Sequence, residues 1–332
     1  MHKIYKELLE CPVCHGELAW DIKEETLDRI INAKVICEEC KADYEVRDEI
    51  AMFLTPDLPR NDLWEQGESA LVNYIDKNPE IRAALLDAPE DELNGADYWY
   101  KASYYEFKKE YEKSFEMFKK ATPIIYTKEY IDAWDKQMNF VVKEGKKQNK
   151  PIVDIASGKC YLVEKFLREL DNYVVATDFS PTILMRNRDY YKSKGLYDKL
   201  SLIAFDARRT PFKDNSIDIM TSNLGIPNIE NPGKLMKELY RICKGIFMPI
   251  MMFFNEDDSP NLDFMKEYGN DSYSTRNSSL KMFNSEPWKC EICSYHIANV
   301  KPTPVGEIIG GMIDGVPVND TVAEFAVVMC EK

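Results

Sequence analysis

The stretch that decides the fold is "IVDIASGKCYLVEKFL", residues 152–167, where a short apolar run gives way to a turn and then to an amphipathic pattern. The apolar run predicts a buried strand that ends at Asp154, and the small residues after it predict a turn. From Tyr161 onward, apolar residues recur at spacings of three and four, which predicts a helix. A strand that passes through a small-residue loop into a helix is typical of nucleotide-binding turns in α/β proteins.

The same alternation of strand and helix continues to the end of the chain. Strands are predicted at 151–156, 173–179, 200–207, 216–223, 245–254 and 323–331, and helices at 160–170, 180–195 and 231–244. Alternation of this kind gives a mostly parallel, doubly wound sheet with helices on both faces. The sequence therefore predicts an α/β domain over residues 151–332.

Three of the predicted strands end on an aspartate. Asp154 closes the first, Asp178 follows 24 residues later, and Asp206 closes the third. The carboxyl ends of parallel strands meet at one edge of such a sheet, where ligands bind. An acidic residue at the second strand end can accept hydrogen bonds from both hydroxyls of a ribose. The three aspartates together predict an adenosine-binding site.

Residues 151–250 resemble the class I S-adenosylmethionine-dependent methyltransferases of the ubiquinone- and menaquinone-methylating type. In that family the first loop reads acidic-x-Gly-x-Gly-x-Gly, and here it reads "DIASGKC", residues 154–160. Gly158 matches the central glycine, while Ala156 and Cys160 replace its neighbours. The resemblance implies a Rossmann-like sheet of seven strands, with S-adenosylmethionine as the cofactor.

The resemblance also assigns roles to individual residues. It implies that Asp178 holds the ribose hydroxyls with Phe179 beside the adenine, and that Asp206 and the backbone N–H of Ala207 contact the adenine ring. Asn223 would lie in the loop that passes beneath the methionine and the transferred methyl group. The implied cofactor site consists of Asp154, Ala156, Ser157, Gly158, Asp178, Phe179, Asp206, Ala207 and Asn223.

Two C-x-x-C pairs mark the first 56 residues. They are "CPVC" and, after a gap of 22 residues, "CEEC", and they supply Cys11, Cys14, Cys37 and Cys40. Two such turns present four sulfurs to one zinc ion, with no coordination position left open, so the predicted zinc is structural. Residues 1–56 resemble the zinc-ribbon modules that precede, or dock onto, certain methyltransferases of tRNA, translation factors and rRNA.

Residues 57–150 are predicted to be a helical linker or lid. Aromatic residues from Tyr104 to Phe118 recur at spacings of three or four, which predicts one amphipathic helix. A second helix is predicted from Ile131 to Val141, ended by Gly145. Aromatic stripes of this kind usually form core, and here they also offer the lining of a substrate site.

Composition narrows the choice of location and substrate. The formal net charge is −14, which disfavours binding to the phosphate backbone of a nucleic acid. No apolar run reaches the roughly 18–20 residues needed to span a bilayer. Nine cysteines without an apolar leader favour reduced thiols and metal ligands, so we expect a cytoplasmic protein.

The function expected from the sequence is methyl transfer from S-adenosylmethionine to a small or medium-sized acceptor, and the Tyr- and Trp-rich helices favour an aromatic or apolar one. One alternative is an RNA methyltransferase, by analogy with the zinc-ribbon relatives. The other is a protein with the same fold that binds S-adenosylmethionine without catalysis. The sequence identifies no general base. A third C-x-x-C, Cys290 and Cys293, is interpreted as buried thiols on a strand or helix end, with a redox site or a second metal site as the alternative.

Overall fold

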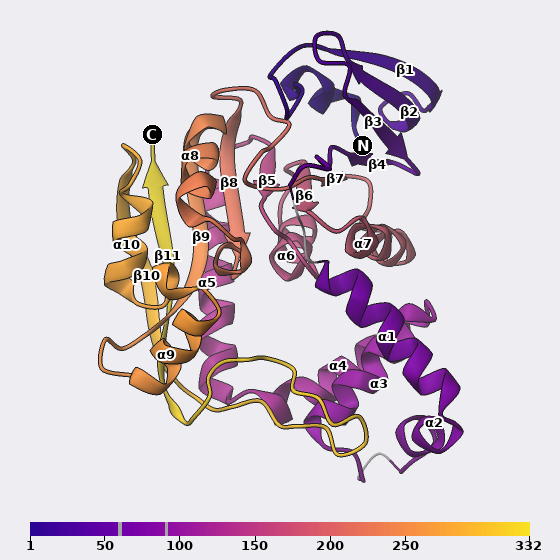
Figure 1. Ribbon diagram of the computed structural model, residues 1–332, viewed down its shortest axis with the longest axis vertical. Helices are drawn as coiled ribbons and strands as arrows, with labels where there is room; N and C mark the ends of the chain where they lie inside the picture. Colours follow the sequence, from indigo (N-terminus) through magenta and orange to yellow (C-terminus); the bar gives the residue numbers. More distant parts are fainter. Residues whose placement is uncertain (59–61, 90–91) are drawn as a thin grey trace.

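The computed structural model describes residues 1–58, 62–89 and 92–332 (Figure 1). Within these ranges, one sheet holds eleven strands in the order β1-β2-β3-β4-β7-β6-β5-β8-β9-β11-β10. The strands are β1 (Leu18–Glu25), β2 (Ile30–Cys37), β3 (Asp43–Arg47), β4 (Ile50–Met52), β5 (Ile152–Asp154), β6 (Val174–Asp178), β7 (Leu200–Ala204), β8 (Ile217–Asn223), β9 (Cys243–Phe254), β10 (Lys289–Val300) and β11 (Thr321–Glu331).

The centre of the sheet is parallel and doubly wound, as the sequence predicts. Strands β7, β6, β5, β8 and β9 pair in parallel, while β11 and β10 complete that side in antiparallel fashion. The chain builds outward from β5 through β6 to β7 and then returns to the other side of β5 with β8. The carboxyl ends of β5 and β8 therefore flank the point where the strand order reverses, which is where such folds bind ligands.

Helices cover both faces of this centre because its strands are apolar on both sides. Neighbouring residues Ile152 and Val153 are both buried, and they belong to different core clusters. The Ile152 face is covered by α5 (Lys128–Lys146), α6 (Tyr161–Glu169) and α7 (Pro181–Ser193). The Val153 face is covered by α8 (Pro232–Ile242) and α10 (Arg276–Phe283). Helix α9 (Ser259–Glu267) packs instead against the start of α5, in the cluster that contains Ala133.

The N-terminal strands extend this sheet instead of forming a separate one. β4 pairs in parallel with β7, with Ile50 opposite Leu202. A bare β7 would leave a row of unpaired backbone groups at the edge, and β4 covers it. The prediction of a seven-stranded sheet therefore missed four strands, because pairing between segments about 150 residues apart leaves no local pattern in the sequence.

The N-terminal residues also replace a covering helix. Residues 205–216, between β7 and β8, form no helix, and the structure describes all of them. The 3-10 helix η1 (Lys3–Leu8) packs there instead: Tyr5 is 1% exposed, and Leu9 bridges to Phe212. The expected boundary between residues 1–56 and the rest remains a prediction, but the two parts share both a sheet and a core.

In the described part of residues 57–150, the segment expected to be a linker or lid, five α-helices are present. Before α5 come α1 (Leu63–Lys77), α2 (Pro79–Leu86), α3 (Gly95–Phe107) and α4 (Tyr111–Ile125). The prediction of one helix through Tyr104 and Phe118 was wrong, because Lys109 has a left-handed φ of 60° that separates α3 from α4. The next predicted helix, ended near Gly145, is confirmed as α5.

The long connection between β10 and β11 reaches across to these helices (Figure 1). Asp97, at the start of α3, is 1% exposed and accepts hydrogen bonds from the backbone N–H groups of Glu307 and Ile308 at 3.0 and 3.1 Å. The connection and the helical segment are thus fastened to one another. None of the helices in the described ranges has the length and apolar character needed to cross a bilayer.

Candidate functional site

The loop between β5 and α6 has the backbone of a glycine-rich turn although it contains one glycine. Ala156, Gly158 and Cys160 have φ angles of 52°, 49° and 62°. This left-handed conformation costs a non-glycine residue roughly 1–2 kcal/mol. The N–H of Ser157 donates to the carbonyl of Thr177 at 2.7 Å and fixes the loop to β6. The two substituted positions therefore retain conformations that glycine adopts readily.

Asp154 supports this loop from below. Its carboxyl is 1% exposed, and Oδ1 accepts a hydrogen bond from the hydroxyl of Thr221 on β8 at 2.6 Å. Burial raises the pKa of Asp154 to about 6. The side chain therefore links the ends of two neighbouring strands, and its position favours a supporting role over contact with a ligand.

Asp178 lies at the end of β6, beside the same loop. Its Oδ2 accepts a hydrogen bond from the N–H of Gly158 at 3.1 Å, and its Oδ1 accepts one from the N–H of Ser180 at 3.0 Å. Burial raises the pKa of Asp178 to about 6, although these two bonds favour the ionised form. Each carboxylate oxygen can accept two hydrogen bonds, so both retain capacity for a hydroxyl donor.

Asp206 follows β7 and is already engaged within the protein. Its Oδ1 accepts hydrogen bonds from the backbone N–H and the Nε of Arg208, both at 2.9 Å, and its Oδ2 lies 2.6 Å from Nη2 of the same residue. The guanidinium also lies 3.2 Å from Glu230. The sequence did not predict this ion pair, although Arg208 is only two residues away. Ala207, between the two, is 8% exposed.

The loop after β8 touches the loop after β5. Ser222 donates its hydroxyl hydrogen to the carbonyl of Ile155 at 2.8 Å. A Cβ atom on Gly225 would lie 2.6 Å from the carbonyl oxygen of Ala156, so this close approach requires glycine. The amide oxygen of Asn223 accepts a hydrogen bond from the indole of Trp134 on α5 at 2.8 Å.

The helical segment covers the glycine loop from the solvent side. Lys159 is 3.2 Å from Glu106 of α3, and its ammonium lies 4.0 Å from the ring centre of Phe118 and 4.7 Å from that of Trp99. The side chains of Lys159 and Glu106 are only 10% and 15% exposed. Neither this ion pair nor its aromatic surroundings could be read from the sequence, because the pairing spans 53 residues and three elements.

The predicted cofactor residues thus fall into two groups. Hydrogen bonds and direct contacts connect the loops that carry Asp154, Ala156, Ser157, Gly158, Asp178 and Asn223. Asp206 and Ala207 follow the neighbouring strand β7, and partly exposed Phe179 follows β6. The structure brings these positions to one edge of the sheet, and the assignment of each to a cofactor atom remains a prediction.

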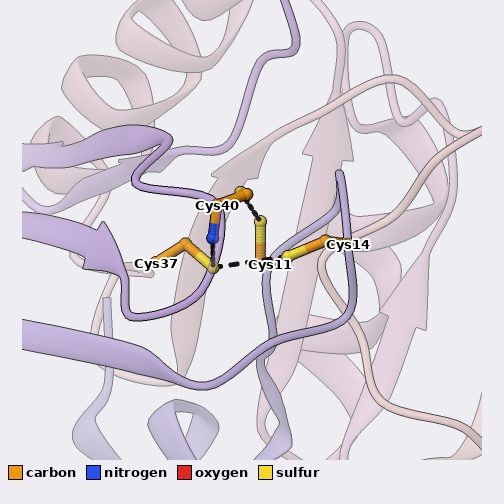
Figure 2. Close-up of side chains that lie close together, drawn as sticks. All are labelled: Cys11, Cys14, Cys37 and Cys40. Atoms are coloured by element: carbon orange, nitrogen blue, oxygen red, sulfur yellow. Dashed lines mark hydrogen bonds between the residues drawn. The ribbon is translucent and has the colours of Figure 1, made fainter.

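The four N-terminal cysteines converge on one point (Figure 2). Their sulfur atoms all lie within 4.8 Å of one another, with 3.6 Å between those of Cys11 and Cys40 and 3.4 Å between those of Cys14 and Cys37. A tetrahedron with zinc–sulfur bonds of about 2.3 Å has sulfur–sulfur edges of about 3.8 Å. The hydroxyl of Tyr44 is 3.4 Å from the sulfur of Cys11 and can donate to a thiolate there. This donor set fits a structural zinc.

The third C-x-x-C lies elsewhere and has other neighbours. Cys290 and Cys293 lie on β10, and both are partly buried. Of the strand and the helix end that the sequence left open, the structure has the strand. Cys290 lies beside Cys330 of β11, with 3.0 Å between their sulfur atoms. Cys293 lies 3.4 Å from the carboxylate of Glu291. These thiols belong to the far edge of the sheet and not to the four-cysteine cluster.

Comparison with known proteins agrees with this arrangement. Residues 153–245 match a protein family described as "Methyltransferase domain". The chain is 28% identical over 102 residues to a ubiquinone/menaquinone biosynthesis C-methyltransferase from Pectobacterium carotovorum, covering 30% of this chain and 41% of that protein. It is 28% identical over 167 residues to a demethylmenaquinone methyltransferase from Bacteroides fragilis, covering 50% of this chain and 66% of that protein.

Among solved structures, protein YcgJ from Bacillus subtilis aligns with a TM-score of 0.48 and 14% identity, over 60% of this chain and 98% of that one. The family match, residues 153–245, contains the strand ends described above. The matches to the two curated relatives span less than two thirds of the length of each relative. The chain therefore contains a methyltransferase domain, of the S-adenosylmethionine-dependent class.

Proposed function

We propose that this protein transfers the methyl group of S-adenosylmethionine to a small or medium-sized acceptor with an aromatic or apolar body. The observation that carries the proposal is the joint between Gly158 and Asp178, where a tight loop and a strand-end carboxylate meet at the reversal of the sheet. A carboxylate in that position is suited to the two hydroxyls of a ribose.

The described residues fit S-adenosylmethionine. The left-handed turn at Ala156 and Gly158 brings backbone close to the ligand without intruding side chains, and Asp178 keeps acceptor capacity on both oxygens. Arg208 already donates hydrogen bonds to both oxygens of Asp206. Asp206 would therefore have to accept from the adenine amino group and from Arg208 at the same time. The bound cofactor supplies an electrophilic methyl group on a sulfonium, and the protein has to align the acceptor with it and exclude water.

The acceptor side is aromatic. Trp134 and Tyr161 lie edge to face with ring centres 5.4 Å apart, and Trp134 is bonded to Asn223 in the loop expected beneath the methyl group. Aromatic side chains at this position favour a small organic molecule with an aromatic or apolar body. The names of the two curated relatives, both methyltransferases of quinone-type compounds, agree with this class of acceptor.

An RNA acceptor has one observation in its favour. A pocket of about 600 Å³ lies between the N-terminal cysteine turn and α8, and Arg209, Lys234, Lys237, Arg241 and Lys332 are among the residues that line it. The arginines there are neutralised: Arg209 pairs with Asp57, and Arg241 pairs with Glu10, Asp214 and Glu238. The net charge of −14 also disfavours RNA, so we favour a small molecule as the acceptor.

The experiment that tests the proposal measures transfer of labelled methyl groups from S-adenosylmethionine to two pools, a small-metabolite extract and total RNA. We expect label in the metabolite pool and background label in the RNA. Label in RNA alone would establish the alternative acceptor. Tight binding of S-adenosylmethionine without transfer to either pool would favour a non-catalytic binding protein.

We also propose that Cys11, Cys14, Cys37 and Cys40 hold one zinc ion with a structural role. Four thiolates fill a tetrahedral shell and leave no open position for catalysis. The ion would fix the strands β1 to β4, which complete the edge of the sheet beside β7.

A further inference from the structure

A row of aromatic rings leads away from the loop that follows β5. Tyr161 is the first residue of α6, directly after the loop, and its ring contacts Trp134. Trp134 and Tyr130 lie one turn apart on α5, with ring centres separated by 6.4 Å, and Tyr130 stacks on Tyr126 at 4.5 Å. Because α5 precedes β5 and runs antiparallel to it, these first turns of α5 lie at the carboxyl edge of the sheet.

The row ends at a carboxylate. The hydroxyl of Tyr126 donates to Oδ2 of Asp314 at 2.6 Å, and Asp314 belongs to the connection between β10 and β11. The two residues are 188 positions apart in the chain, so this contact is produced by the fold alone. The chain thus places one acidic side chain at the end of a row of four rings that begins beside the loop after β5.

Asp314 has no cationic partner among the residues that the structure describes. Its carboxylate forms no ion pair with a described residue and accepts a hydrogen bond from the neutral hydroxyl of Tyr126. Burial raises the pKa of Asp314, which means that ionisation of this carboxyl is penalised where it stands. A cation that arrives beside it would offset this penalty, whereas a neutral donor would offset little of it.

The rings of this row are partly exposed. Tyr161 is 42% exposed, and Tyr126, Tyr130 and Trp134 are each partly exposed. Aromatic faces attract cations, and organic ammonium groups are bound by clusters of tyrosine and tryptophan beside a carboxylate. A purely apolar acceptor would have no use for Asp314, and an anionic acceptor would be repelled by it.

We infer that Tyr126, Tyr130, Trp134, Tyr161 and Asp314 bind the methyl acceptor, and that this acceptor is an organic amine held as its ammonium ion. The inference rests on the proposed function, since it identifies the substrate class of the same site. Asp314 accepts a charge-assisted hydrogen bond from the ammonium, the rings surround the group and its apolar body, and Tyr126 orients the carboxylate. Asp314 acts in binding, and no transfer step is assigned to it.

The test is calorimetric titration of the full-length protein, saturated with S-adenosylhomocysteine, with two probes of nearly equal shape: 2-phenylethylamine, which is cationic at pH 7, and 2-phenylethanol, which is neutral. We expect the amine to bind about tenfold more tightly than the alcohol, as one charge-assisted contact provides. Asp314→Asn should bring this ratio close to one. Asp320→Asn, the same change on an exposed aspartate in the same connection, should leave it unchanged.

Equal affinity for the two probes, or a ratio that survives Asp314→Asn, would overturn the inference. If Asp314→Asn melts below the assay temperature, Tyr161→Leu serves in its place, because that ring is exposed enough to be removed without opening the core. It should weaken the amine several-fold more than the alcohol, and equal weakening would count against the cation site. A separate titration with S-adenosylhomocysteine shows whether the cofactor site itself fails, which would end the proposed function instead.

Discussion

The backbone N–H of Gly158 donates a hydrogen bond to Oδ2 of Asp178 at 3.1 Å, and this bond joins the loop after β5 to the end of β6. The second oxygen of the same carboxylate accepts from Ser180, so Asp178 both shapes the loop and holds the start of α7. A residue that would contact the cofactor is therefore also part of the scaffold. Substitutions here affect binding and stability together, and each test has to separate the two.

Ala156→Gly should leave the stability of the protein unchanged or raise it slightly. Ala156 has a φ of 52°, which costs alanine about 1 kcal/mol and glycine almost nothing. After the greater entropy of glycine in the unfolded chain is subtracted, we expect an unchanged or slightly raised unfolding free energy by chemical denaturation. The matched control, Ala83→Gly in the exposed part of α2, should lose about 1 kcal/mol. A loss at position 156 as large as that at position 83 would show that the loop conformation is not strained.

The stability of the protein should depend on the ionisation of Asp154. Its pKa is raised to about 6 in the folded protein, against about 4 in an unfolded chain. Between these values the folded state binds more protons, so this residue contributes stability below pH 4 that is lost as the pH rises through 6. When the pH is raised from 5 to 7, the unfolding free energy of Asp154→Asn, measured by chemical denaturation, should therefore fall by about 1 kcal/mol less than that of the wild type. Parallel pH profiles for the two proteins would refute this.

Glu106→Gln should destabilise the contact between α3 and the glycine loop. Glu106 pairs with both Lys159 and Arg186, and all three side chains are 15% exposed or less. Removal of one member of a buried ion pair costs about 3 kcal/mol, whereas an exposed pair contributes less than about 1 kcal/mol. Glu110→Gln, which breaks the exposed pair with Lys113, is the matched control. Equal unfolding free energies for the two variants would contradict a stabilising contact between α3 and the glycine loop.

Zinc should be present at one equivalent per chain, and its loss should weaken the sheet. Cys37→Ser removes one ligand of the four-cysteine cluster, while Cys293→Ser removes a thiol outside it. We expect elemental analysis to show stoichiometric zinc in the wild type and in Cys293→Ser, and less in Cys37→Ser with a clearly lower melting temperature. Because β4 completes the edge beside β7, the whole protein should melt in one shifted transition. Zinc-free wild-type protein with unchanged stability would contradict the assignment.

The parts of the fold that local patterns encode could be predicted from the sequence. Apolar runs ending at Asp154 and Asp178 gave strands that end at these residues, and the two C-x-x-C turns gave four sulfurs in one cluster. Each apolar run and each C-x-x-C turn is a pattern of a few consecutive residues, so it can be recognised without knowledge of distant parts of the chain. The left-handed conformation of Ala156 was not predicted, although the likeness of this loop to a glycine-rich turn was.

The parts that depend on distant segments could not be predicted. The pairing of β4 with β7, the contact of Lys159 with Glu106 and the contact of Tyr126 with Asp314 join residues at least 53 positions apart. The break between α3 and α4 was missed because the aromatic spacing continues across it. The ion pair of Asp206 with Arg208 was missed for a different reason: a carboxylate at a strand end can accept hydrogen bonds from a ligand or from a nearby arginine, and the sequence does not distinguish the two.

The central claim is that Asp178 binds the ribose of S-adenosylmethionine, and Asp178→Asn tests it better than alanine. Alanine would lose both backbone hydrogen bonds along with the ligand contacts. Asparagine keeps one acceptor and the shape of the side chain, although its NH₂ group must face either Gly158 or Ser180. Because the pKa of Asp178 is raised to about 6, a requirement for the ionised form predicts that wild-type affinity falls about tenfold from pH 7 to pH 5.

The most direct measurement is calorimetric titration of S-adenosylmethionine into the wild type, Asp178→Asn and the exposed control Asp171→Asn, each first shown to be folded by a thermal melt. We predict that Asp178→Asn weakens binding by about tenfold or more at pH 7 and abolishes its pH dependence, as expected when a charge-assisted hydrogen bond is lost. Asp171→Asn should bind as the wild type does. A folded Asp178→Asn protein with wild-type affinity at both pH values would contradict the account.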